Sequence, residues 1–572
     1  MNKVKSLPKP DSPVSGYLRK NGRMIICYAV FAVFCLYSVW LITIHEPWRD
    51  EAQSWLIARD ASFGGMLAQL PYEGHPVMWF LILMPFAKLG FPFMTQAIIH
   101  LLFVAGIGYM ICIKSPFHPI YKVLILGSTT MLYITNVFAR NYAPAVFLIL
   151  LIAYIYETRY KKHYILYGIL ISCLANFNVY SCIVAIALIA ADLMEIIYSA
   201  VEKKSFDIIK ERLRDKRFLI ATGIFALGFA VFPVTMGTAL FSPFLSAAPN
   251  NEELTIWSLN MVRNPTPIGA LPDSLVSVAM LTEVRFFDVL NMALPNAHPF
   301  VLALPVLFLA LVPCLLIKNR AMRVYIFVAS FLAVIGTAFF YALYYNSPLT
   351  SRHVAALVFA VISMYWLAID TNKAADDQEI KNAKRRMKQK SRQVKKQAGG
   401  KKPIYKQAVS IVLAVVFIPV MIFSFYQNLV EGVLFDTDEI ISNGAGAAQF
   451  LLENGYDRKD CLIVAAAPTM HASILPHLRN INAFLYPYGF RSFAKWQEVV
   501  VDMTLPDYEA MISEEFAKNP GKYIDALIIL TYNETQQVTS ETDAYLARCE
   551  ILFNSDSISV TKEDFIIFKA PD

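Results

Sequence analysis

Pro47-Trp48-Arg49-Asp50-Glu51-Ala52-Gln53 decides the fold, together with a second stretch, Glu73-Gly74-His75-Pro76. Both stretches lie in the short polar interval between the first two long apolar segments of the chain. A pair of acidic side chains is strongly disfavoured in the hydrocarbon of a bilayer. Asp50 and Glu51 must therefore lie at the membrane surface or line a water-filled cavity.

Two interpretations of the acidic pair stay open. The residues after Asp50 alternate between apolar and polar, which predicts an interfacial helix that is broken near Gly64-Gly65. In the first interpretation Asp50 is the N-cap of that helix, and Gln53 completes a capping box three residues later. In the second, the pair forms a catalytic centre at the membrane surface.

The composition excludes a soluble globular protein. The chain has 572 residues, of which 56% are hydrophobic and 17% charged, and its apolar runs recur at the length of about 20 residues that crosses a bilayer. The first run, Met24 to Ile44, is too long for a signal-peptide core and lacks a small-residue cleavage site, so we expect a retained helix. The net charge of +7 comes from basic clusters beside these runs, which indicate orientation and not nucleic-acid binding.

The expected fold is mainly α, a polytopic transmembrane module of about eleven spans with a small C-terminal soluble α/β domain. Basic residues are enriched in cytoplasmic segments. They predict a cytoplasmic tail at 1–23, a membrane module at 24–430 with a cytoplasmic basic linker at 370–405, and an extracytoplasmic domain at 431–572. The apolar segments after the first are 76–92, 94–113, 119–138, 142–157, 164–199, 217–236, 298–317, 324–345, 352–369 and 406–428.

The number of spans depends on residues 164–199, which are long enough for two short helices broken at Asn176-Phe177-Asn178. Counting them as one interrupted unit gives eleven spans and places the C-terminal domain outside, whereas counting two gives twelve and places it inside. We favour eleven, because all three strongly basic interruptions are then cytoplasmic. This choice leaves Lys161 and Lys162 outside, against the rule.

Two further outer segments follow from this count, the loop 237–297, with an amphipathic part near Leu271 to Leu290, and the turn 346–353. In the C-terminal domain, 462–465, 526–530 and 565–568 predict strands, and 443–454, 507–518 and 539–547 predict helices. Cys461 and Cys549 are the two cysteines outside apolar segments, and either a disulfide or two free thiols is open.

Four motifs in this order resemble the GT-C superfamily of membrane glycosyltransferases, in particular the protein O-mannosyltransferases and the aminoarabinose transferases of family 39. They are Asp50-Glu51 after the first span, His75-Pro76, Ala139-Arg140-Asn141-Tyr142, and Thr350-Ser351-Arg352-His353. The sequence departs from the family pattern at Val77, Ala139 and His353, where the family has Pro, Ser and Tyr. It also lacks the family's arginine at the start of the third span.

The resemblance implies an inverting transfer of sugar from a polyprenyl-phosphate donor to a lipid, glycan or protein acceptor at the outer face of a cell membrane. Asp50 is the expected general base, and Glu51 orients it, binds sugar hydroxyls or faces water. The expected substrate-binding residues are His75, Glu73, Arg352, His353 and Arg49, with Arg352 on the donor phosphate or anchored at the interface.

Arg140 falls on the cytoplasmic side of the eleven-span arrangement, where a structural role is expected. No ligand spacing compels a cofactor, although Asp50, Glu73 and His75 could together hold a divalent cation. A polytopic transporter, a lipid-linked glycan flippase and a polymerase are the alternative functions, but few acidic residues lie in the middle of a span, as a transporter would favour.

Overall fold

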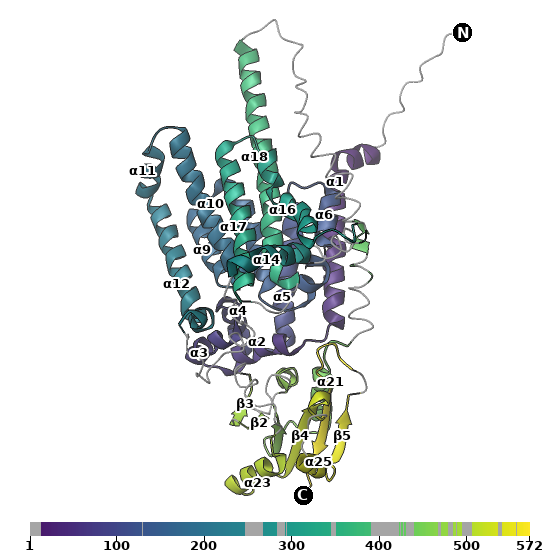
Figure 1. The fold of residues 1–572 in the computed structure, drawn as a ribbon. Helices are drawn as coiled ribbons and strands as arrows, with labels where there is room; N and C mark the ends of the chain where they lie inside the picture. The colour runs from purple at the N-terminus through teal and green to yellow at the C-terminus, as the bar shows by residue number, and fades with distance from the viewer. Residues whose placement is uncertain are drawn as a thin grey trace, which may run out of the picture.

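A bundle of long helices carries a small sheet domain at one end (Figure 1). This is a computed structural model. It describes residues 13–128, 130–245, 267–282, 294–344, 351–389, 440–466, 471–478, 484–487, 489–494, 506–535, 540–555 and 558–571, with isolated positions at 292 and between 422 and 430. Predictions for residues 246–266, for most of 283–293, for the turn at 345–350 and for most of 390–439 lie outside this part of the chain.

Seven helices of the described residues are long and apolar enough to cross a membrane, or up to eight when one bent pair counts as a span. The seven lie within α1 (Pro13–Ile44), α5 (Met94–Tyr109, extended by a π turn to Lys114), α10 (Val179–Glu202), α12 (Lys216–Leu245), α16 (Pro299–Leu316), α17 (Arg320–Tyr344) and α18 (Ser351–Gln389). The bent pair joins α6 (Pro119–Leu126) to the stretch Thr130–Val137, which ends in α7 (Thr135–Val137). The protein is therefore a multi-pass membrane protein.

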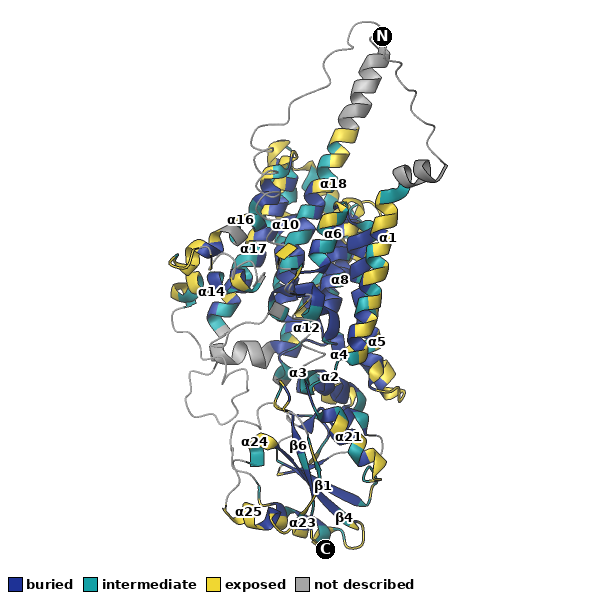
Figure 2. Ribbon diagram, turned by 90° about the vertical axis from the view of Figure 1, so that its right-hand side faces the viewer, coloured by how far each residue is buried: buried dark blue, intermediate teal, exposed yellow. Residues whose placement is uncertain are grey.

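Exposed apolar side chains support this assignment. Val33 and Leu36 on α1 are 66% and 71% exposed, and Leu102 on α5 is 68% exposed. Figure 2 shows this exposure along the outer flank of α1, whereas the inner helices are largely buried. Such apolar surface is stable against lipid and not against water.

The second predicted span, 76–92, does not form a helix of spanning length. The helix α4 (Met78–Lys88) has 11 residues. It therefore rises only about 16 Å, against about 30 Å of hydrocarbon. It ends where Gly90 adopts φ +81°, a left-handed conformation that other residues avoid. The prediction of a full span here is wrong.

Residues 164–199 form two separate helices and not one interrupted span, although the break lies where the sequence predicts it. They are α9 (Tyr164–Ala175) and α10, separated at Asn176-Phe177-Asn178. The Asn178 side chain caps α10 by accepting a hydrogen bond of 2.8 Å from the Ser181 N–H. The Asn176 carbonyl accepts from the Met78 N–H at 3.1 Å, which joins the break to the start of α4.

With α4 no longer a span and 164–199 counted as two helices, Lys161 and Lys162 lie on the same side of the membrane as the other basic segments, in agreement with the positive-inside rule. Arg217, at the start of α12, donates to the Lys161 carbonyl at 3.0 Å, so both lie at the same end of the bundle. Nearby, Arg159 binds Asp192 at 3.1 Å and Glu195 at 2.6 Å, both on α10. These basic segments lie at the end of the bundle away from the sheet domain (Figure 1).

The remaining helices of the module are α8 (Tyr142–Ile155), α11 (Asp207–Arg214) and α14 (Pro267–Thr282). The helix α14 covers part of the predicted amphipathic stretch. The helix α18 continues as far as Gln389, so the first half of the predicted linker 370–405 is a helical extension of a span and not a loop.

The C-terminal domain has a six-stranded mixed sheet in the order β3-β2-β1-β4-β6-β5. The strands are β1 (Cys461–Ala465), β2 (Phe484–Tyr486), β3 (Gly489–Arg491), β4 (Asp525–Thr531), β5 (Glu550–Asn554) and β6 (Phe565–Lys569). The helices α21 (Gly444–Glu453), α23 (Tyr508–Lys518), α24 (Tyr532–Thr535) and α25 (Ser540–Leu546) accompany them. Every residue of β1 is buried, because apolar side chains pack on both faces of the sheet. The predicted strands and helices are thus confirmed.

The thiols of Cys461 and Cys549 are both free. Cys461 begins β1, and Cys549 precedes β5, which lies three strands away in the sheet. Neighbouring strands are about 4.8 Å apart, so the separation is roughly 14 Å. A disulfide needs Cα atoms within about 7 Å.

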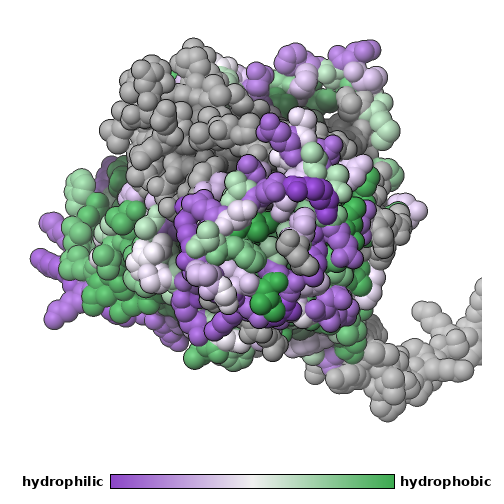
Figure 3. Space-filling model, turned by 90° about the horizontal axis from the view of Figure 1, so that it is seen from below, coloured by the Kyte–Doolittle hydropathy of each residue, from purple (hydrophilic) through white to green (hydrophobic). Residues whose placement is uncertain are grey.

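The end view in Figure 3 shows a mostly hydrophilic surface over this domain, flanked by hydrophobic surface.

Candidate active site

The helix α2 (Arg49–Asp60) carries the acidic pair at its first turn, at the end of the bundle that faces the sheet domain (Figure 1). Its N-cap is Trp48, so Asp50 is the second residue of the helix, and the interpretation of Asp50 as N-cap is wrong. The Glu51 carboxylate, and not Gln53, accepts from the Trp48 backbone N–H, at 3.4 Å. The predicted break near Gly64-Gly65 lies two residues earlier, where Ser62 caps α3 (Phe63–Glu73).

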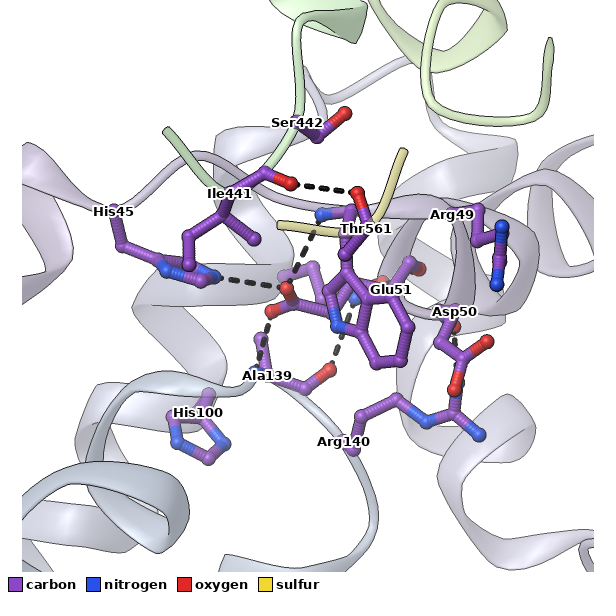
Figure 4. A network of polar contacts seen from close by, with 12 residues as sticks. His45, Arg49, Asp50, Glu51, His100, Ala139, Arg140, Ile441, Ser442 and Thr561 are labelled. Atoms are coloured by element: carbon purple, nitrogen blue, oxygen red, sulfur yellow. Dashed lines mark hydrogen bonds and ion pairs between the residues drawn. The ribbon is translucent and has the colours of Figure 1, made fainter. Parts of the chain in front are cut away.

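Glu51 is buried at the centre of a polar network (Figure 4). Its Oε1 accepts from the Ala139 backbone N–H at 2.6 Å, and its Oε2 lies 2.9 Å from the His45 Nε2. Gln96 donates from Nε2 to the carbonyls of Glu51 and Ala139, each at 3.0 Å. Glu51 therefore fixes the loop before α8 against α2. It does not face water.

Asp50 points away from Glu51, toward two arginines. Its Oδ2 lies 3.4 Å from the Arg140 Nη1 and 3.9 Å from the Arg352 Nη1. Arg140 also donates to the Asp50 carbonyl. The Arg352 guanidinium lies 5.3 Å from the centre of the Trp48 ring, which orients it by a cation–π contact. The Asp50 side chain keeps 20% of its surface exposed, so a substrate can reach it.

Arg140 therefore belongs to the candidate site, and its predicted placement on the opposite side of the membrane is wrong. The error follows from α4, because one false crossing between Asp50 and Arg140 reverses the side of each following segment as far as 164–199, where the second miscount restores it. Arg140 comes from the short segment between α7 and α8, which Glu51 holds through Ala139. Arg352 comes from the first turn of α18.

His75 and His353 both pack against Tyr142. The ring of Tyr142 is 6.5 Å from that of His75 and 6.1 Å from that of His353, which in turn lies 5.3 Å from Tyr180. The His75 Nδ1 is buried and has no hydrogen-bond partner among the described residues. Burial, together with the positive charge of Arg140, holds the pKa of His75 well below its usual range, so the ring is neutral.

Glu73 takes part in a clamp that we define as Gln53, Gln69, Glu73 and Ala494. Gln53 and Gln69 each donate to the Glu73 Oε1, at 2.8 Å, and to the Ala494 carbonyl, at 2.7 and 2.8 Å. The Ala494 N–H donates back to the Gln53 Oε1 at 2.9 Å. The clamp thus binds the backbone of one loop of the C-terminal domain between α2 and α3.

Arg49 also contacts the C-terminal domain. Its backbone N–H donates to the Glu563 Oε1 at 3.3 Å, and its Nε lies 3.8 Å from the same oxygen. Ser442 donates to the other oxygen of Glu563 at 2.6 Å. Burial of Glu563 raises its pKa to about 7. A substrate-binding role for Arg49 or Glu73 stays a prediction, since their observed partners join the two domains.

The trio of Asp50, Glu73 and His75 is not assembled as a metal site. Across the described residues, no group of three His, Cys, Asp or Glu side chains is placed to hold a metal ion. What the geometry does assemble is one partly exposed carboxylate, two guanidinium groups and a neutral aromatic wall. This set can accept a proton from a hydroxyl and bind an anionic oxygen.

Comparisons with known proteins find solved structures of the same fold. No family model matches the chain, and no curated protein matches it. A crystal structure of ArnT from Cupriavidus metallidurans bound to undecaprenyl phosphate matches with a TM-score of 0.51 and 12% identity, over 96% of this chain and 98% of that one. ArnT from the same organism in the apo state matches over the same shares with a TM-score of 0.49 and 10% identity. ArnT is an aminoarabinose transferase of the GT-C superfamily, so this chain has a GT-C-like fold.

Proposed function

We propose that this protein is a membrane glycosyltransferase that transfers a sugar from a polyprenyl-phosphate donor to an acceptor hydroxyl. The observation that carries the proposal is the contact of Asp50 with Arg140 and Arg352, which come from different parts of the bundle. The fold that the chain shares with ArnT supports it, because one of the matched ArnT structures holds undecaprenyl phosphate. The site occupies the end of the bundle where α2 meets the sheet domain.

In the proposed reaction Asp50 is the general base and the transfer is inverting. The acceptor oxygen attacks the anomeric carbon as its proton passes to the Asp50 carboxylate. The bond from that carbon to the phosphate oxygen breaks, and the electron pair leaves with the polyprenyl phosphate. A positioned base contributes about 10²–10⁴-fold to such a step.

The two arginines explain how one carboxylate is held and then released. Both distances to Asp50 exceed the 2.7–2.9 Å that is typical of a charge-assisted hydrogen bond. The phosphodiester of the donor offers two non-bridging oxygens to the same guanidinium groups and can take them over from the carboxylate. Donor binding would then leave Asp50 free to accept the acceptor proton and would stabilise the charge of the leaving phosphate.

Asp50→Asn tests the proposal, because asparagine keeps the shape and loses the basic oxygen. Transfer from a polyprenyl-phosphate sugar is expected to fall by about 10²-fold or more, with folding and membrane insertion retained. Asp507→Asn is the matched control, since Asp507 caps α23 and asparagine caps a helix about as well. Full activity of Asp50→Asn with a donor that the wild type uses would refute Asp50 as the base.

A further inference from the structure

A cavity of about 810 Å³ lies between the bundle and the C-terminal domain, and part of its wall is α2. Glu51, Trp55 and Arg59 form one wall, because residues four apart share a face of a helix. Ala97 on α5 and Ala445 in the C-terminal domain lie on other walls. The volume is in the range that holds a small molecule or a lipid headgroup.

This cavity is distinct from the candidate active site. None of Asp50, Arg140 and Arg352 is among its lining residues. Successive residues of an α-helix point about 100° apart. The Asp50 side chain therefore points away from the wall that Trp55 and Arg59 form, and a molecule in the cavity would not compete with a phosphate on the two arginines.

Two buried polar atoms on the cavity wall lack a partner among the described residues, the Gln96 Oε1 and the His477 Nε2. Gln96 is 1% exposed, and its Nε2 already donates to two carbonyls, so its Oε1 needs a donor from elsewhere. Burial lowers the pKa of His477 to about 4, so its ring is neutral. Both atoms are suited to hydroxyl groups of a ligand.

The charges on the wall disfavour an anion. The lining side chains include three carboxylates, those of Glu46, Glu51 and Asp60, against one guanidinium, that of Arg59. Arg59 is engaged by Asp60 at 2.8 Å and by the Leu475 carbonyl at 3.3 Å. A ligand headgroup in this cavity is therefore not an anion, unlike the phosphate that suits Arg140 and Arg352.

The apolar part of the lining continues into the exposed apolar surface of the bundle. Phe91 and Met94, which line the cavity, are 50% and 53% exposed, and they lead onto the exposed Ile98 and Leu102 along α5. Because α5 is one of the membrane-spanning helices, this route leads into lipid. A molecule that fits both parts has a hydroxyl-bearing head and an apolar tail.

We infer that this cavity binds an uncharged, hydroxyl-bearing amphiphile, separately from the donor phosphate. A resident membrane glycolipid and a lipid sugar acceptor share this chemistry. Binding at this place also joins the two domains, because the head would contact α2, α5 and the C-terminal segment at His477.

The test uses the full chain in nanodiscs that contain a monohexosyl diacylglycerol or, as the alternative, a phosphatidic acid with the same acyl chains. Native mass spectrometry measures lipid occupancy. We expect retention of the neutral glycolipid and little retention of the anion. Ala97→Trp on α5 and Ala445→Trp in the C-terminal domain both place a large side chain in the cavity and are each expected to lower occupancy at least tenfold. Leu227→Trp, on the exposed face of α12 and outside the cavity lining, is the control that keeps it. His477→Phe loses one hydrogen bond and is expected to lower it about fivefold.

The addition of a polyprenyl-phosphate sugar then distinguishes the two sources of the lipid. A bound glycolipid that gains the mass of one sugar is an acceptor, and one of unchanged mass is resident. Occupancy does not depend on transfer, so this test can succeed even if Asp50 is not a base. Unchanged occupancy in both tryptophan variants, or equal retention of the phosphatidic acid, would overturn the inference.

Discussion

The replacement of Glu51 by glutamine tests whether the Glu51 carboxylate holds the local structure together or takes part in the proton transfer. Glu51 accepts from the Ala139 N–H at 2.6 Å and from the Trp48 N–H at 3.4 Å, and it lies 2.9 Å from His45. Glutamine keeps one acceptor oxygen, and we expect this oxygen to accept from the Ala139 N–H, which makes the shorter bond. Its NH₂ group then faces the Trp48 N–H, and two donors oppose each other.

The magnitude follows from these contacts. A hydrogen bond to a charged acceptor contributes about 1.5–3 kcal/mol, and a buried donor left without a partner costs about 1–3 kcal/mol. His45 can offset part of this loss, because its other tautomer accepts a hydrogen bond from the new amide. We therefore expect Glu51→Gln to destabilise the first turn of α2 by about 2–3 kcal/mol. Arg140 follows Ala139, so transfer activity is expected to fall about tenfold, less than in Asp50→Asn.

Thermal unfolding in detergent and transfer kinetics on the same preparation measure both effects. The melting temperature of Glu51→Gln is expected to drop by a few degrees, together with the smaller loss of activity. Glu514→Gln, on the exposed face of α23, is the matched control. An unchanged melting temperature with a loss of 10²-fold or more would mean that Glu51 itself moves the proton, and our assignment of Asp50 would be wrong.

Three further predictions follow from the site and its surroundings. Arg352→Lys keeps the charge without the planar fork and is expected to raise the KM for the donor. Arg352→Ala is expected to lower kcat/KM by an amount that corresponds to about 1.5–3 kcal/mol of lost stabilisation. Unchanged donor kinetics in both variants would mean that Arg352 only anchors the helix at the membrane interface. Burial raises the pKa of Glu563 to about 7, above its unfolded value of about 4.3, so folding stability is expected to fall as pH rises from about 4.3 to 7 and to level off above. Melting curves measure this slope, and an unchanged slope in Glu563→Gln would contradict the assignment. A reporter cysteine at Asn519 is expected to react with an impermeant reagent in intact cells, and one at Lys203 only after permeabilisation; the reverse would place the C-terminal domain inside.

The sequence predicts the strands of the C-terminal domain, and it places Asp50 and Arg352 on the same side of the membrane. Both predictions depend on local patterns of hydropathy and charge. The side of the membrane for Arg140 depends instead on every crossing before it. Lys88 and Gly90 lie inside the supposed span 76–92, and a charge beside a helix-ending glycine is the signal that could have shortened it.

Other parts of the site carry no sequence signal of this kind. The clamp joins Gln53 to Ala494, and no local pattern relates residues 441 positions apart. The burial of Glu51 beneath the loop at Ala139 is equally a product of tertiary packing. A glutamate at position 51 is compatible with an exposed carboxylate and with a buried one, and only the fold decides between these alternatives.

The clamp also sets the order of events during synthesis. Ala494 leaves the ribosome 441 residues after Gln53, which at about 5–20 residues per second is a delay of roughly 20–90 s. Until then α2 and α3 lack the loop that holds them together. A chain released before residue 494 would thus lack the loop that joins α2 to α3, so the candidate site at the start of α2 depends on a segment that is made much later.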